Sequence, residues 1–256
     1  MKVVILAGGF GTRLAEETDM RPKPMVEIGG YPILWHIMKL LSAQDFSQFY
    51  IALGYKGESI KRYFVDHYTL NGNLRVNLLS GAVSHYEKEA ENWEVHLIDT
   101  GIATMTGGRV KKLESFLKDA SFMVTYGDGV SDINLQALLA QHRKNQTIAT
   151  VTAVRPPARF GEIILDGHRV SRFSEKPQAG EGWINGGFII FEPSVFDLIQ
   201  GDEAVLERDI LEVLAAKGEL GVYCHDGFWQ CMDTLRDKRS LETLWESKKA
   251  PWKIWS

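Results

Sequence analysis

The chain has 256 residues, of which 45% are apolar and 24% are charged, and its formal net charge is −4. This composition is that of an ordinary globular protein with enough apolar residues for a full core, and it excludes a disordered chain. A mildly acidic charge argues against a general nucleic-acid-binding protein, because such a protein shows a basic excess. Anions can still bind where a few cations converge on one site.

Two cysteines, Cys224 and Cys231, are too few for a disulfide framework and lack His or Cys partners at the spacing of a zinc site. We therefore expect reduced, partly buried thiols. The apolar run at the N-terminus is too short for a signal peptide and breaks into glycines followed by Arg13. No segment reaches the roughly 18 consecutive apolar residues of a membrane-spanning helix. We expect a cytoplasmic protein without a membrane partner.

Short β-branched runs alternate with helical periodicity along the first half of the chain. The first run, 3–7, is continuously apolar, as expected for a strand buried on both faces of a parallel sheet. The patterns predict strands over 3–7, 49–53, 74–79, 94–98 and 122–126, and helices over 33–41, 59–66 and 110–116.

The second half contains a strong hairpin signal, Asp166-Gly167, flanked by alternating runs. The other patterns predict helices over 135–142, 206–216 and 234–247, and strands over 148–154, 162–165, 170–174, 184–191 and 220–224. The alternation favours an α/β fold, a Rossmann-like, doubly wound, mixed but mostly parallel sheet flanked by helices, with the hairpin as a small sub-structure. No repeat or linker interrupts the pattern, so we expect one domain over 1–256.

A glycine-rich loop, with Gly8, Gly9 and Gly11, directly follows the first predicted strand. Glycines permit positive φ and let backbone amides approach a phosphate, although a tight turn explains three glycines equally well. Leu14 stands where a dinucleotide-binding fingerprint needs its third glycine, and Gly-Thr-Arg replaces the Gly-Lys-Ser/Thr of a P-loop.

Two cations accompany this loop. Arg13 lies within it, and Lys23 follows ten residues later between Pro22 and Pro24, which hold it in extended backbone. A lone lysine between prolines is ordinarily a solvated loop residue. Together with the glycines and the arginine, however, it indicates a polyphosphate site.

The segment 6–25, LAGGFGTRLAEETDMRPKPM, resembles the signature of the sugar-phosphate nucleotidylyltransferases, G-G-x-G-T-R-L-x-P-x-T followed by P-K-P-M. Glu16 departs from the proline of most members. That variant, together with the stretches 99–101, 106–109 and 125–129, resembles the glucose-1-phosphate cytidylyltransferase branch. The resemblance extends along the whole chain and implies a nucleotide-binding half over about 1–130 and a sugar-binding and oligomerisation half over about 131–256.

Two aspartates are candidate metal ligands. Asp128 follows a predicted buried strand, at the sheet edge where open α/β folds bind ligands. It could also be a turn residue capping the next helix, although Asp132 is the better cap, and Asp233 could simply cap the helix that begins at Thr234. Mg²⁺ typically takes one or two carboxylates plus phosphate oxygens and water. The resemblance places the metal on Asp128 and Asp233.

The resemblance also implies the substrate-binding residues. On the sugar side these are Gly161, Glu175, Lys176 and Asn185, although Glu-Lys-Pro alone reads as a solvated turn. The resemblance implies that Arg109 and Thr104 take part in selecting the nucleobase. The alternative for Arg109 is an arginine at the start of a helix that faces solvent. The nucleotide-binding set is Leu6, Ala7, Gly8, Gly9, Gly11, Thr12, Arg13, Lys23, Gly81, Thr104, Arg109 and Gly127.

The implied reaction is CTP plus α-D-glucose 1-phosphate giving CDP-glucose and diphosphate. The attacking phosphate is already ionised, so catalysis needs positioning and charge neutralisation rather than a general base. Arg13, Lys23 and Asp128 would be the catalytic residues, and Lys176 would align the sugar phosphate. Removing one such charge contact should cost roughly 2–4 kcal/mol.

Three alternatives stay open. The nucleotide could be UTP, dTTP, GTP or ATP. A Rossmann NAD(P)-dependent oxidoreductase needs an acidic residue about 20 residues past the glycines, after a second strand, whereas the only match, Glu27, precedes it. A non-catalytic sugar-nucleotide sensor is disfavoured by the retention of Arg13, Lys23 and Asp128 together.

Four of the seven tryptophans crowd the C-terminus, where core packing or subunit contact is expected. An exposed aromatic tail would be a poor monomer surface, so we expect a homo-oligomer, a hexamer by resemblance. The resemblance further implies that the product feeds dideoxyhexose synthesis for lipopolysaccharide O-antigen. The four tryptophans are Trp229, Trp245, Trp252 and Trp255.

Overall fold

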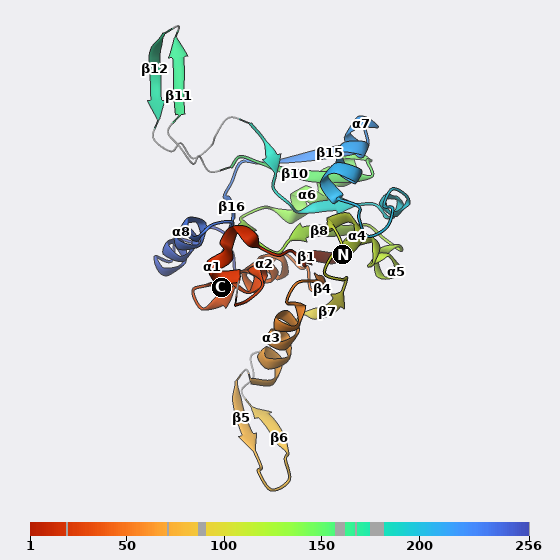
Figure 1. Ribbon diagram of the computed structural model, residues 1–256, viewed down its shortest axis with the longest axis vertical. Helices are drawn as coiled ribbons and strands as arrows, with labels where there is room; N and C mark the ends of the chain where they lie inside the picture. The colour runs from red at the N-terminus through yellow and green to blue at the C-terminus, as the bar shows by residue number, and fades with distance from the viewer. Residues whose placement is uncertain are drawn as a thin grey trace.

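A computed structural model describes residues 1–18, 20–70, 72–86, 91–156, 162–166, 168–174 and 182–255. A mostly parallel sheet lies at the centre, with helices packed on both faces. Two β-hairpins project from opposite ends of this body (Figure 1). Among the described residues, no helix is long and apolar enough to cross a membrane.

The described part of the central sheet has eight strands in the order β13-β10-β14-β8-β1-β4-β7, with β15 also paired to β10. Neighbours are parallel except where β14 and β13 run antiparallel to β8 and β10. The strands are β1 (Lys2–Ala7), β4 (Gln48–Leu53), β7 (Glu94–Asp99), β8 (Phe122–Tyr126), β10 (Ala149–Val154), β13 (Ile184–Asn185), β14 (Ile189–Phe191) and β15 (Leu220–His225).

Strand β1 lies between β4 and β8 and is parallel to both. Its side chains alternate between two cores: Val3 and Ile5 pack on one face of the sheet, and Val4 and Leu6 on the other. This two-sided burial explains why the run is apolar without interruption.

Helices cover both faces of the sheet. The core under Val3 and Ile5 receives residues from α2 (Ile33–Ser42), α3 (Gly57–Leu70), α6 (Leu135–Asn145) and α8 (Leu235–Glu246). The opposite core receives residues from α4 (Thr106–Lys111), α5 (Glu114–Leu117), the π-helix η4 (Leu206–Leu211) and α7 (Glu212–Ala216). The predicted fold class is confirmed.

Shorter elements complete the described chain. The loops carry one-turn helices, and four two-stranded sheets of the described residues lie outside the central one, one of them the β5–β6 pair (Asn73–Val76 and Val83–Tyr86). These elements are η1 (Thr12–Leu14), α1 (Ala15–Thr18), η2 (Lys23–Met25), η3 (Pro193–Asp197), β2 (Glu27–Ile28) with β3 (Tyr31–Pro32), β9 (Gly129–Ser131) with β16 (Trp229–Cys231), and β11 (Glu162–Asp166) with β12 (Arg169–Ser174). The last pair is the predicted hairpin.

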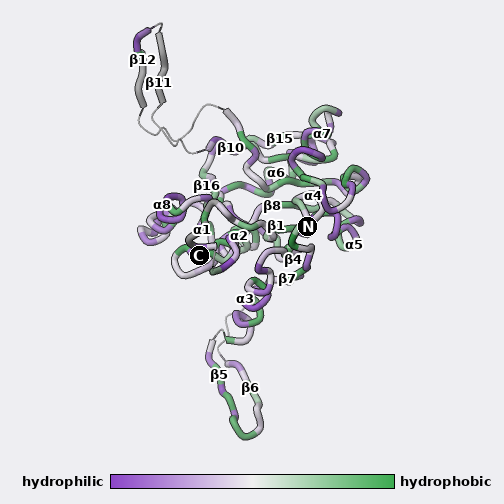
Figure 2. Tube along the Cα trace, viewed as in Figure 1, coloured by the Kyte–Doolittle hydropathy of each residue, from purple (hydrophilic) through white to green (hydrophobic). Residues whose placement is uncertain are grey.

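The segment 74–79 was expected to be a strand alternating with helices like the others, and instead it forms a separate hairpin. Strand β5 (Asn73–Val76) pairs antiparallel with β6 (Val83–Tyr86), which sequence patterns did not indicate. The side chain of Asn77 accepts hydrogen bonds from two turn amides, and Gly81 takes a positive φ of 71°. The turn is thus encoded locally, while its apolar residues stay exposed (Figure 2).

The expected strand over 184–191 is interrupted. Gly187 has a φ of 78°, so the chain bends between β13 and β14. A side chain at Gly186 would clash with Val154, because a Cβ there would lie 2.5 Å from that residue's Cγ1. The bend brings Asn185 to the end of the sheet near Tyr126.

The C-terminal tryptophans belong largely to the core. Trp252 is fully buried, stacks on Phe228 with 5.6 Å between ring centroids, and donates its indole N–H to His36 Nδ1 at 3.3 Å. Trp245 and Trp255 pack against the same core. The inference of an oligomer from an exposed aromatic tail was therefore wrong in its premise.

Candidate active site

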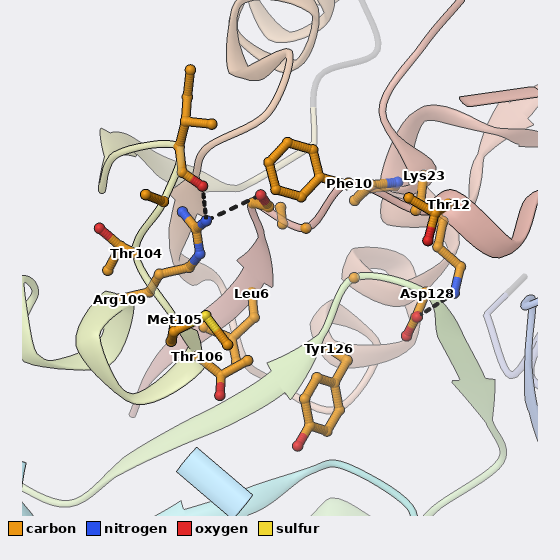
Figure 3. Close-up of a pocket in the computed structure, with 18 of the residues that line it drawn as sticks. Leu6, Phe10, Thr12, Lys23, Thr104, Met105, Thr106, Arg109, Tyr126 and Asp128 are labelled. Carbon is orange, nitrogen blue, oxygen red and sulfur yellow. Dashed lines mark hydrogen bonds and ion pairs between the residues drawn. The ribbon is translucent and has the colours of Figure 1, made fainter. Parts of the chain in front are cut away.

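A cavity of about 390 Å³ opens beside the carboxyl ends of β1 and β8 (Figure 3). Its size suits a ligand of nucleotide scale. Its walls come from the glycine loop, the segment around η2, the start of α4 with the loop before it, the end of β8, and Asp233 two residues after β16. The lining residues are Leu6, Ala7, Gly8, Gly9, Phe10, Gly11, Thr12, Lys23, Pro24, Ile102, Ala103, Thr104, Met105, Thr106, Arg109, Tyr126, Gly127, Asp128 and Asp233.

The glycine loop forms one wall because its backbone lies close to neighbouring groups. Gly11 has a φ of 65°, which other residues rarely adopt. At Gly8 a Cβ would lie 2.2 Å from Arg109 Cζ, so only glycine fits over that guanidinium. At these glycines the loop therefore presents backbone to the cavity, beside the side chains of Phe10 and Thr12 (Figure 3).

Arg109 is buried and fixes this wall from behind. Its guanidinium donates hydrogen bonds to the carbonyls of Leu53 at 2.9 Å, Gly101 at 2.8 Å and Gly8 at 3.1 Å. Burial lowers the pKa of Arg109, an effect opposed by the negative charge of Asp99 and Asp202. The alternative of a solvent-facing, helix-start arginine was wrong, because only 5% of the residue is exposed.

Lys23 and two aspartates meet at one end of the cavity. The Lys23 ammonium lies 2.6 Å from Asp128 Oδ2 and forms a second ion pair with Asp233 Oδ1. Figure 3 shows Lys23 and Asp128 reaching toward each other from different elements. The two carboxylates, 105 and 210 residues away along the chain, thus converge on one point.

This carboxylate pair fits a divalent cation. Hard oxygen donors from one or two carboxylates, completed by phosphate oxygens and water, are what Mg²⁺ usually takes in nucleotide sites. Within the described residues, no cluster of three or more His, Cys, Asp or Glu side chains could hold a metal by itself. A metal here would therefore rely on the substrate for part of its coordination.

The charges at this point also set the protonation of Lys23. Burial alone would lower the pKa of the ammonium, but the charges of and hydrogen bonds to Asp128 and Asp233 outweigh it and raise the pKa. Lys23 is therefore cationic at neutral pH. Nearby, burial followed by the charge of Asp233 raises the pKa of the free thiol of Cys231 to about 12.

The capping alternatives for the aspartates are settled by other residues. Thr234 caps α8 in a reciprocal capping box with Asp237, so the side chain of Asp233 is directed to Lys23 instead. The expectation that Asp132 caps α6 was wrong, because Asn134 is the N-cap. Asp132 accepts a hydrogen bond from the amide of Phe228 and lies 2.9 Å from His225.

Most of the sequence-predicted nucleotide residues line this one cavity, and Gly81 is the exception among those whose side chains or backbone the structure fully describes. It lies in the turn of the β5–β6 hairpin, which projects away from the body (Figure 1). The backbone of Arg13 lies in η1, but its side chain falls outside the described part of the structure. The residues lining the cavity as predicted are Leu6, Ala7, Gly8, Gly9, Gly11, Thr12, Lys23, Thr104, Arg109, Gly127, Asp128 and Asp233.

The sugar-side predictions lie mostly outside the described residues. Gly161, Glu175 and Lys176 fall there. Asn185 is described: it is exposed, and its amide nitrogen lies 3.4 Å from the hydroxyl of Tyr126.

Sequence reasoning missed two polar residues that line the cavity. Tyr126 lies two residues before Asp128, at the same strand end, and this spacing was an available signal. Thr106 begins α4 within the stretch used for the resemblance, yet no role was assigned to it. Both hydroxyls donate hydrogen bonds to Glu207, a residue of η4 that no local pattern connects with the site.

A family model described as nucleotidyl transferase matches residues 2–237. The chain belongs to the nucleotidyl transferase family. It is 49% identical to a glucose-1-phosphate cytidylyltransferase of Salmonella typhi and 40% identical to a probable glucose-1-phosphate cytidylyltransferase of Bacillus subtilis. Each alignment spans 256 residues and 100% of both chains. The resemblance drawn from the motifs is confirmed, and the oxidoreductase alternative is set aside.

Solved structures agree on the fold. HddC of Yersinia pseudotuberculosis superposes with a TM-score of 0.71 at 23% identity, covering 95% of this chain and 99% of that one. A putative glucose-1-phosphate thymidylyltransferase of Bacillus anthracis gives 0.69 at 18% identity, covering 95% and 94%. Nucleotidyltransferases of this family generally use a divalent metal, which agrees with the paired carboxylates.

Proposed function

We propose that the chain catalyses the reaction of CTP with α-D-glucose 1-phosphate to give CDP-glucose and diphosphate. The observation that carries the proposal is the convergence of the glycine loop, Lys23, Asp128 and Asp233 on one cavity. The choice of cytosine and glucose is supported by the full-length relatives named for that activity.

Each residue is assigned a role from its position at the cavity. The backbone of the glycine loop faces the cavity and is suited to phosphate oxygens. Lys23 is a partly buried point charge at the same end, held in a fixed place by its two carboxylates. Arg13, one residue beyond Thr12 in η1, is assigned to the charge that develops on the α-phosphorus and the leaving diphosphate.

Asp128 and Asp233 would hold the metal, for which we propose Mg²⁺. When bound there, the ion would neutralise charge on the triphosphate oxygens. The sugar phosphate is an ionised nucleophile, so no side chain has to remove a proton. On the sugar side, Lys176 is assigned to aligning the attacking phosphate. Gly161, Glu175 and Asn185 are assigned to the hexose.

The test is a diphosphate-release assay with glucose 1-phosphate, Mg²⁺ and each of CTP, UTP, dTTP, GTP and ATP. We expect release with CTP well above the other four. Release chiefly with another nucleotide would contradict the base assignment. No release with any of the five would contradict an enzymatic role and favour a sugar-nucleotide sensor.

We also infer that the chain forms a homo-oligomer, a hexamer by resemblance. Support comes from apolar side chains exposed at the end of α3 and on the β5–β6 hairpin, including Tyr68, Leu78 and Leu79. Exposed apolar patches of this kind commonly mark protein–protein contacts. A solution mass near the 28.9 kDa of one chain at micromolar concentration would contradict the inference.

A further inference from the structure

Glu207 connects two walls of the cavity although it does not line the cavity itself. Its carboxylate accepts a hydrogen bond from the hydroxyl of Tyr126 and another, at 2.9 Å, from the hydroxyl of Thr106. Tyr126 ends β8, and Thr106 begins α4. Figure 3 shows the Tyr126 hydroxyl pointing away from Asp128, so the phenol extends from the end of β8 to a different part of the site.

The π-helical turn of η4 supports this placement. Glu207 lies in the first turn of that helix, and the amide of Leu206 donates a hydrogen bond to Thr106 Oγ1 at 2.8 Å. Thr106 is therefore held by the backbone of η4 as well as by Glu207. Short π-helical segments are rare and often occur at functional sites.

From Tyr126 the hydrogen-bond chain continues to the sugar side. The amide nitrogen of Asn185 lies 3.4 Å from the Tyr126 hydroxyl, and Asn185 Oδ1 accepts a hydrogen bond from the amide of Gly187 at 3.0 Å. The Tyr126 ring packs on Gly187, where a Cβ would lie 3.1 Å from the ring's Cδ2. These contacts fix which end of the Asn185 amide faces the backbone.

The direction of each hydrogen bond between Glu207, Tyr126 and Asn185 follows from which group carries the hydrogen. Burial, then the charge of Glu207, raises the pKa of Tyr126 above its usual range, so the phenol stays protonated. It donates to Glu207, and its oxygen is left to accept from Asn185. The Asn185 amide has two N–H hydrogens, and only one is used in this contact. The second can donate to a ligand oxygen.

We propose that Glu207 is a positioning residue for the sugar phosphate. By holding the phenol of Tyr126, it orients the Asn185 amide so that the remaining N–H can donate to a hexose hydroxyl. This inference rests on the proposed function, since it concerns the sugar side of that same site. Glu207 does not line the cavity, so it acts through the two hydroxyls that it holds, and its effect on the sugar side passes through Tyr126.

The test compares Tyr126→Phe, Glu207→Ala and the double variant with wild type. Tyr126→Phe keeps the ring on Gly187 and removes only the hydroxyl. Glu212→Gln is the matched control, because Glu212 follows η4 at the start of α7 and is exposed. For each protein, KM is measured separately for the sugar phosphate and for the nucleotide, with kcat, and the melting temperature checks the fold.

We expect each single variant to raise the KM for the sugar phosphate about tenfold, as the loss of one charge-assisted hydrogen bond would. The rise in the KM for the nucleotide should be at least about fivefold smaller than the rise in the KM for the sugar phosphate. Glu212→Gln should change neither KM. The double variant should be no worse than the poorer single variant, because the two residues act in one chain.

The proposal is overturned if Tyr126→Phe leaves the sugar-phosphate KM within about twofold of wild type, or if both KM values rise equally. If Glu207→Ala does not fold, Tyr126→Phe decides the question alone. If wild type prefers another nucleotide, the proposed function is contradicted but this inference is not. The KM values of wild type and the variants are then compared with that nucleotide.

Discussion

The proposed nucleotide side and the proposed sugar side of the site are built in different ways. On the nucleotide side, the loops after β1 and β8 follow buried parallel strands whose register fixes where they end. On the proposed sugar side, the exposed residue Asn185 ends β13, next to the bend at Gly187. The first side is fixed by the core of the protein, and the second by a chain of side-chain hydrogen bonds.

This difference predicts different responses to substitution. A change on the nucleotide side removes charge or backbone support from a rigid wall, so it should reduce turnover or stability strongly. A change on the sugar side should mostly weaken the binding of one substrate.

The largest effect is expected from Lys23→Met. Loss of a charge contact to the phosphates should lower kcat about 10²–10³-fold, on the scale of losing an oxyanion donor. Asp128 and Asp233 would also lose their shared counter-charge. We therefore expect Mg²⁺ alone to raise the melting temperature of Lys23→Met more than that of wild type. Lys118→Met, at an exposed position, is the control. This expectation assumes that the Lys23 ammonium competes with Mg²⁺ for Asp128 and Asp233, and an equal Mg²⁺ shift in both proteins would contradict it.

A smaller effect on turnover is expected from Arg109→Met, which removes the support behind the glycine loop. The carbonyls of Gly8, Leu53 and Gly101 would lose a buried donor, at a cost of about 2–4 kcal/mol in the free energy of unfolding. We expect the KM for CTP to rise about tenfold, with little change for the sugar phosphate. Denaturant unfolding and steady-state kinetics measure both, with exposed Arg143→Met as the control. A larger rise in the KM for the sugar phosphate than in the KM for CTP would contradict the proposed difference between the two sides.

The core beneath the nucleotide side should respond to acid through His36. Trp252 can only donate, so its bond to His36 Nδ1 requires the neutral ring, whose Nε2 then donates to the carbonyl of Ile28. Burial lowers the pKa of His36 from 6.5 to about 4. The unfolded chain therefore binds this proton first, and stability falls as the pH drops from about 6.5 toward 4.

The full loss from His36 is about 3 kcal/mol once the pH is below the folded pKa. His36→Gln keeps a donor for Ile28 but does not titrate in this range. Denaturant unfolding from pH 7 to pH 4 should therefore show a steeper loss of stability in wild type than in His36→Gln. Parallel pH profiles would contradict this prediction.

The nucleotide side was largely predictable from sequence because its signals are local. Gly8, Gly9 and Gly11 follow a continuous apolar strand, and Lys23 is framed by prolines. Pairing Asp128 with Asp233 was a resemblance rather than a derivation, since the two residues lie 105 positions apart and no local pattern connects them. Only the fold brings both to Lys23.

Other features could not be predicted because they depend on tertiary contacts. The buried position of Arg109 arises from carbonyls on three separate segments. The packing of Trp252 against His36 joins residues 216 positions apart. The position of Glu207 depends on a π-helical turn that no sequence pattern indicates. The β5–β6 hairpin was missed because its second strand lacks an apolar alternation.

The most direct test of the account measures which sugar nucleotide forms when all five nucleoside triphosphates compete for glucose 1-phosphate in the presence of Mg²⁺. Products of wild type, Asp128→Asn and the exposed control Asp226→Asn are separated and identified by mass. We predict that wild type and Asp226→Asn make CDP-glucose and that Asp128→Asn makes it at least about 100-fold more slowly. A different sugar nucleotide from wild type, or undiminished CDP-glucose from Asp128→Asn, would contradict it.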